Sequence, residues 1–187
     1  NGKSPFTAYA ALINGALGSP YKIATTFAKT VPLILTGLAT AVAFSSGIFN
    51  IGGEGQLYLG AFAAAYMGFT FTNLPGIAGI PLALIFAALA GGFYALVPAL
   101  LKVKYGIDEV ITTIMFNSNA TLFTSYLANY PFASSVGKMG ATEMIAPAYK
   151  LLRLVARSKL HTCIFYTALI ALFIYYLMEK TSAGYDF

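Results

Sequence analysis

The stretch Phe49-Asn50-Ile51-Gly52-Gly53-Glu54-Gly55-Gln56 interrupts a sequence that is otherwise apolar from residue 31 to residue 71. Irregular backbone inside a bilayer must be buried against protein or face a watery cavity, because lipid offers its polar groups no partners. We interpret Gly52, Gly53 and Gly55 as a structural break, since glycine tolerates conformations that other residues avoid. The sequence therefore predicts a broken helix near residues 50–56 in a membrane protein.

The composition of the 187 residues supports a membrane protein. Apolar residues make up 58% of the chain and charged residues 9%, whereas a soluble domain has about 25% charged residues. So few charges cannot cover a soluble surface, which excludes a disordered chain, a disulfide scaffold and an ordinary cytosolic enzyme. The net charge of +5 indicates anchoring beside anionic lipid headgroups and not nucleic-acid binding, because the basic residues lie between apolar runs.

Five segments are read as membrane spans, each of which needs about 20 largely apolar residues. They are residues 31–49, 56–71, 77–101, 107–130 and 160–178, with a loop at 131–159. Residues 6–17 and 21–30 are interpreted as two separate interfacial or partly buried helices. Small residues recur every four positions on two spans, which predicts close helix packing: Gly60, Ala64 and Gly68, and Ala83, Ala87, Gly91, Ala95 and Ala99. The predicted fold is an all-α, polytopic transmembrane helical bundle, and both ends of the chain suggest part of a longer protein.

The carboxylate of Glu54 is the first candidate for function, because a charge at membrane depth is costly. Broken helices in transporters place helix ends and freed backbone groups beside the translocation route. The alternative is that Glu54 caps a helix starting at Gly55 or Gln56, where a negative charge favours the positive end of the dipole. Both interpretations remain open from sequence.

A second polar group lies between residues 106 and 117. Asp108 and Glu109 are expected to open a helix, which complements its dipole without any further role. Thr113 and Asn117 are four residues apart and therefore share one helix face. They are expected either to hydrogen-bond another helix, which we favour, or to line a polar path.

Several kinds of chemistry are excluded. The sequence contains no Gly-x-x-x-x-Gly-Lys-Ser/Thr pattern, so we expect no ATP binding through a phosphate loop. His161 is the one histidine and Cys163 the one cysteine, which excludes a His-based metal cluster. We expect no catalytic residue, no metal and no cofactor.

Four blocks, in order, resemble those of bacterial ABC-importer permeases that serve branched-chain amino acids, simple sugars and nucleosides. The first has the pattern Asn-Ile-Gly-x-Glu-Gly-Gln, followed by Gly-Ala-Phe. The opening residues 4–9 and the long loop 131–159 look most like the nucleoside branch. The four blocks are residues 49–56 with 60–62, residues 109–115 with Asn117, residues 159–161, and residues 181–187.

The resemblance implies a permease subunit of the bacterial cytoplasmic (inner) membrane that translocates a nucleoside or simple sugar. It implies partners: ATP-binding subunits that hydrolyse ATP, a second permease subunit and an extracellular substrate-binding lipoprotein. An ion-gradient-driven secondary transporter or channel is the alternative. We hypothesise that Thr181, Gly184 and Tyr185 couple to the ATPase. The substrate path is hypothesised to run along Asn50, Glu54, Gln56, Thr113 and Asn117.

The distribution of basic residues and the family resemblance predict opposite orientations of the chain in the membrane. The positive-inside rule places the side with more basic residues in the cytoplasm. The resemblance instead implies that Lys102, Lys104 and Lys180 face the cytoplasm, and we favour it because motif order is more specific. The other side carries eight basic residues: Lys3, Lys22, Lys29, Lys138, Lys150, Arg153, Arg157 and Lys159.

Overall fold

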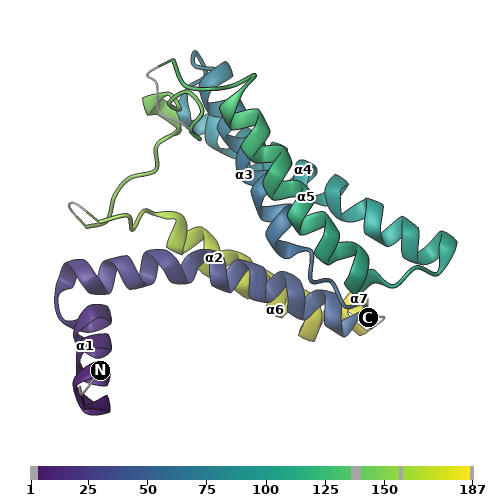
Figure 1. Ribbon diagram of the computed structural model, residues 1–187, viewed down its shortest axis with the longest axis horizontal. Coiled ribbons are helices and arrows are strands. Elements are labelled where there is room, and N and C mark those ends of the chain that lie inside the picture. Colours follow the sequence, from purple (N-terminus) through teal and green to yellow (C-terminus); the bar gives the residue numbers. More distant parts are fainter. Residues whose placement is uncertain (1–3, 136–139, 156–157, 186–187) are drawn as a thin grey trace. The chain divides into compact units, whose positions relative to one another are not determined.

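A computed structural model describes residues 4–135, 140–155 and 158–185. It confirms the predicted all-α class (Figure 1). The chain divides into two units, one reaching up to Val42 and resuming at Leu151, the other running from Ala43 to Lys150. The helices are α1 (Pro5–Leu17), α2 (Pro20–Ser45), α3 (Gly53–Thr70), α4 (Gly76–Tyr105), α5 (Glu109–Asn129), the 3-10 helix η1 (Pro147–Tyr149), α6 (Cys163–Lys180) and α7 (Ser182–Tyr185).

Three of these helices, α2, α4 and α6, are long and apolar enough to cross a membrane. Most of the apolar side chains on these three helices are not buried against other parts of the protein. A helix that is apolar on most of its surface is suited to lipid or to neighbouring membrane helices. The chain is therefore a multi-pass membrane protein. The membrane boundaries of the five predicted spans stay predictions.

The first long helix differs from its predicted form. Residues 21–30 are not a separate helix, because α2 runs without interruption from Pro20 to Ser45. The Ser19 hydroxyl accepts a hydrogen bond from the Lys22 N–H at 3.2 Å, and Pro20 follows as the first helical residue, a combination that favours a helix start. Pro32 consequently lies inside the helix.

In the second unit α3, α4 and α5 pack against one another (Figure 1). The predicted stripes of small residues meet between α3 and α4. A Cβ on Gly60 would lie 3.0 Å from the Ala87 carbonyl oxygen, and one on Gly91 would lie 3.3 Å from that of Gln56. The two backbones therefore approach closely, as the spacing predicted.

Helix α3 begins beside the middle of α4. Gly91, which contacts Gln56, lies 15 residues after Gly76 and 14 before Tyr105. At about 1.5 Å per residue, α4 is roughly 45 Å long and α3 roughly 27 Å. The second half of α4 therefore has no α3 beside it.

The other end of this helix pair is covered by the segment that includes η1. The Ala146 N–H donates to the Gly68 carbonyl at 2.9 Å, and the Tyr149 hydroxyl donates to the Phe71 carbonyl at 2.9 Å. Met67 and Ala83 pack with these two residues into a small apolar core. Part of the predicted loop 131–159 is thus bound to the helix ends.

Candidate functional site

The break between α2 and α3 lies slightly earlier than predicted. The non-helical residues are 46–52, and residues 53–56 already belong to α3. The Asn50 side-chain oxygen accepts hydrogen bonds from the Gly52 N–H at 2.9 Å and from the Gln56 amide at 3.3 Å. Because Asn readily bonds its own backbone two residues on, Asn50 fixes the turn into α3.

The three glycines of the predicted break have different structural roles. Gly52 is the N-cap of α3, whereas Gly53 and Gly55 are helical, so the prediction that these two form the break is wrong. Gly55 is needed for close packing instead. A Cβ there would lie 3.0 Å from the Asn117 side-chain oxygen and 3.1 Å from the Tyr94 ring.

Asn117 joins α5 to the break. Its side-chain oxygen accepts from the Gly55 N–H at 2.8 Å, and its amide nitrogen donates to the Ile51 carbonyl at 2.9 Å. The first N–H groups of a helix have no partner within the helix, so Asn117 satisfies one of them on α3. The favoured prediction that this helix face bonds another helix is confirmed for Asn117. Thr113 instead donates to the Glu109 carbonyl of its own helix at 2.7 Å.

Glu54 is exposed on the first turn of α3. No residue of the described part of the chain forms a hydrogen bond or ion pair with its carboxylate. The alternative that Glu54 caps a helix starting at Gly55 or Gln56 is wrong in position, because α3 starts at Gly53 and Gly52 is its N-cap. A favourable interaction with the positive end of the helix dipole remains.

An ion pair ties α4 to α5 across their connecting turn. The Lys102 ammonium lies 2.5 Å from the Glu109 carboxylate, whose side chain is 11% exposed. Gly106 takes a left-handed φ of 67° in the turn, and the Asp108 carboxylate caps α5 by accepting from the Val110 N–H at 2.8 Å. The prediction that acidic residues open this helix is confirmed.

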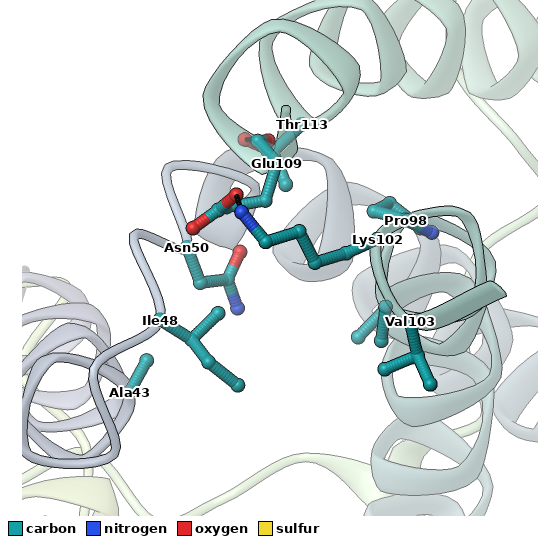
Figure 2. Close-up of a pocket in the computed structure, with 10 residues that line it drawn as sticks. Ala43, Ile48, Asn50, Pro98, Lys102, Val103, Glu109 and Thr113 are labelled. Carbon is teal, nitrogen blue, oxygen red and sulfur yellow. Dashed lines mark hydrogen bonds and ion pairs between the residues drawn. The ribbon is translucent and has the colours of Figure 1, made fainter. Parts of the chain in front are cut away.

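A pocket of about 200 Å³ lies under this ion pair. Figure 2 shows Lys102 extending across it to Glu109, with Asn50 and Ile48 on the opposite wall. The pocket follows from the short α3, because its α4 wall lies wholly beyond Gly91. That wall is the single face formed by Ala95, Pro98, Ala99, Lys102 and Val103, and the remaining lining comes from Ala43, Ile48, Asn50, Glu109 and Thr113.

The structure thus brings four predicted path residues together at the break: Asn50, Gln56, Thr113 and Asn117. The proposed coupling residues belong to the other unit. There the Thr181 hydroxyl donates to the Leu177 carbonyl at 2.6 Å, and the Gly184 N–H donates to the Thr181 carbonyl at 3.2 Å. Tyr185 is the last residue of α7. A role in coupling stays a prediction for all three.

The Lys102–Glu109 pair was missed from sequence. Six residues, which include the turn, lie between Lys102 and Glu109. Their contact depends on the directions that α4 and α5 take on either side of this turn, in which Gly106 has a left-handed φ. The available signal was a lysine in the last turn of one helix followed by a glutamate in the first turn of the next, the placement that helix dipoles favour.

We expect this pair to stabilise the α4–α5 connection. Lys102→Met should lower the melting temperature of the full-length permease in detergent by several degrees, because it leaves the Glu109 carboxylate in its pocket without a counter-charge. The double exchange Lys102→Glu with Glu109→Lys restores opposite charges and should recover much of the loss. Lys104→Met, two residues after Lys102 and outside the ion pair, is the matched control. Equal melting temperatures for the two single Lys→Met variants would contradict the role.

Comparison with known proteins identifies relatives along the whole chain. The sequence profile described as "Branched-chain amino acid transport system / permease component" matches residues 22–187. The guanosine ABC transporter permease protein NupP of Bacillus subtilis is 37% identical over 188 aligned positions, covering 100% of this chain and 54% of that protein. No solved structure matches the chain at a significant level.

Two further relatives cover less of the chain. The glucose ABC transporter permease protein TsgB13 of Haloferax volcanii is 35% identical, over 79% of this chain and 38% of its own length. The nucleoside ABC transporter permease protein NupB of Lactococcus lactis is 36% identical, over 72% and 37%. The chain thus spans about half or less of the length of these relatives. From the profile match and the NupP similarity, the chain belongs to the family of branched-chain amino acid transport system permease components.

Proposed function

We propose that the chain is the membrane-spanning part of a permease subunit in an ATP-binding-cassette importer that moves a nucleoside across the cytoplasmic membrane. The observation that carries this proposal is the 37% identity, over the whole chain, to a permease named for guanosine. A simple sugar is the second candidate, because a permease named for glucose is 35% identical over 79% of the chain.

Such a permease acts with partners. ATP-binding subunits hydrolyse ATP on the cytoplasmic side, a second permease subunit completes the route, and an extracellular lipoprotein delivers the substrate. Alternating access then exposes a central route to each side in turn, and nucleotide binding biases that equilibrium. In this proposal α7, with Thr181, Gly184 and Tyr185, lies near the contact with the ATPase.

The proposed route runs beside the break between α2 and α3. Asn50, Gln56, Thr113 and Asn117 gather there, where α3 begins halfway along α4. Glu54 supports the same placement, because no partner is found for its carboxylate among the described residues and a charge at this depth needs a polar surrounding. A helix that starts within the membrane directs its positive end and free N–H groups at the route.

The decisive experiment measures uptake of labelled guanosine by cells with and without the parent gene. We expect deletion to abolish an uptake component that ATP depletion also abolishes and that an ionophore leaves intact. Excess unlabelled glucose should not compete. An uptake component that needs the gene but follows the ion gradient would instead establish the secondary-transporter alternative. Competition by glucose would move the substrate to the sugar class.

A further inference from the structure

The pocket under the Lys102–Glu109 pair has the size and walls of a site for a single or fused ring. Its volume is about 200 Å³, whereas one water occupies about 30 Å³ in the liquid and drug-sized ligands take about 300–1,000 Å³. Ala95, Pro98 and Ala99 are spaced along one face of α4 and form an apolar wall. Figure 2 shows Ile48 across the pocket from Pro98. Two such walls accommodate a flat ring better than a molecule that carries hydroxyls on every side.

The pocket also contains an unused hydrogen-bond donor. The Asn50 side-chain oxygen is occupied by the Gly52 N–H and the Gln56 amide. No partner is found among the described residues for its amide nitrogen, which can donate two hydrogen bonds. Figure 2 shows this nitrogen turned away from Glu109, toward the space beside Ile48.

The charges in the pocket cancel. The Lys102 ammonium and the Glu109 carboxylate are paired at 2.5 Å, so a charged ligand would have to enter a pocket that offers it no net counter-charge. The Thr113 hydroxyl hydrogen is donated to the Glu109 carbonyl, which leaves the Thr113 oxygen as an acceptor. The pocket therefore combines a donor, an acceptor and apolar walls without net charge.

We propose that this pocket binds the uncharged heterocyclic base of the transported molecule, with the Asn50 amide donating to a ring acceptor and the Lys102–Glu109 pair closing the space above it. The proposal rests on the function proposed above and deepens it. It places the base, and not the sugar, beside the second half of α4, which extends beyond the first residue of α3.

The test replaces Asn50 by aspartate in the intact transporter. Asn50→Asp keeps an oxygen for the Gly52 N–H but removes both N–H donors. We expect the KM for guanosine uptake to rise about 10-fold or more, as follows from losing a hydrogen bond and leaving a partner unpaired. Asn129→Asp is the matched control: its oxygen likewise accepts a backbone N–H, from Gly140 at 2.8 Å, but it does not line the pocket. Its KM should stay within about 2-fold, in line with the small effect of most changes outside a site.

Analogues of guanosine separate recognition from misfolding. The wild-type transporter should discriminate against 7-deazaguanosine or nebularine, which lack the N7 and O6 acceptors of the base respectively. Asn50→Asp should discriminate against neither, since the donor that reads the acceptor is gone. Wild-type discrimination retained in the variant would overturn the pocket proposal. Absence of guanosine uptake by the wild type would overturn the proposed function instead.

A second variant tests the space without touching Asn50. Ala99→Leu adds three carbons to the apolar wall and should abolish guanosine uptake at normal protein levels. Val97→Leu adds one carbon to α4 outside the pocket lining and should leave uptake unchanged. Full uptake by Ala99→Leu would show that no base occupies the pocket.

Discussion

Replacing Asn117 by leucine is expected to abolish nucleoside uptake and to destabilise the full-length permease by about 1–3 kcal/mol. The leucine fills a similar volume but removes both hydrogen bonds of the side chain, to the Gly55 N–H and the Ile51 carbonyl. The Gly55 N–H is partly buried, and stranding such a group costs about 1–3 kcal/mol. The bond to Ile51 is exposed and contributes less. Asn117 bonds Ile51 before the start of α3 and Gly55 within its first turn, so its loss affects both sides of this turn. Unfolding in denaturing detergent and guanosine uptake measure the two effects.

The control for this change is Asn119→Leu, two positions further along α5. Asn119 is exposed, and no hydrogen bond to its side chain is found in the described part of the chain. The same chemical change there should leave stability and uptake near wild type. Similar losses from both substitutions would show that Asn117 acts through helix α5 itself and not through the break.

Asn117→Asp separates the two hydrogen bonds. The aspartate keeps an acceptor for the Gly55 N–H, but its second oxygen faces the Ile51 carbonyl, so two acceptors oppose each other. Uptake should therefore fall although the shape is preserved. Protonation returns a donor toward Ile51, and partial recovery of stability at acidic pH is the expected sign of this geometry.

The residues that mark close packing were predictable from the sequence. Gly60 and Gly91 each belong to a repeat of small residues every four positions, on α3 and on α4 respectively. Such a repeat places the small residues on one face of its helix, and it can be recognised without knowing which helix packs there. Likewise the acidic start of α5 follows from local chemistry, since Asp108 bonds N–H groups two and three residues on. Both features depend on neighbours within one or two helical turns.

The long-range contacts of the site could be predicted only in part. The sequence favoured a bond between Asn117 and another helix, but not its partner, because Gly55 lies 62 residues away. The glycine-rich stretch likewise does not show that Gly52 caps a helix while Gly55 makes room for the Tyr94 ring. The pocket depends on how far α3 extends along α4, which is a property of the assembled helices. Pattern and propensity carry no such information.

Gly60→Val is expected to disrupt the α3–α4 pair, with a loss of about 1–3 kcal/mol or more, typical of overpacking. A Cβ at Gly60 would lie 3.0 Å from the Ala87 carbonyl oxygen. That atom belongs to helical backbone and cannot move aside by changing rotamer, so the two helices must separate. Helix propensity alone predicts the opposite sign, because valine is a better helix former than glycine. A loss of stability in Gly60→Val would therefore show that Gly60 packs closely against the α4 backbone at Ala87.

The matched substitution is Gly92→Val, next to the packed Gly91 on α4. A Cβ at Gly92 meets no atom within 4 Å, so only the gain in propensity remains, and stability should be unchanged or slightly higher. Both variants are measured in the full-length permease by unfolding in denaturing detergent and by guanosine uptake. Because α3 carries the break, separating it from α4 also moves Asn50 and Gln56 away from the proposed route. Gly60→Val should thus lose uptake together with stability, and retention of both would mean that α3 and α4 do not pack this closely in the membrane.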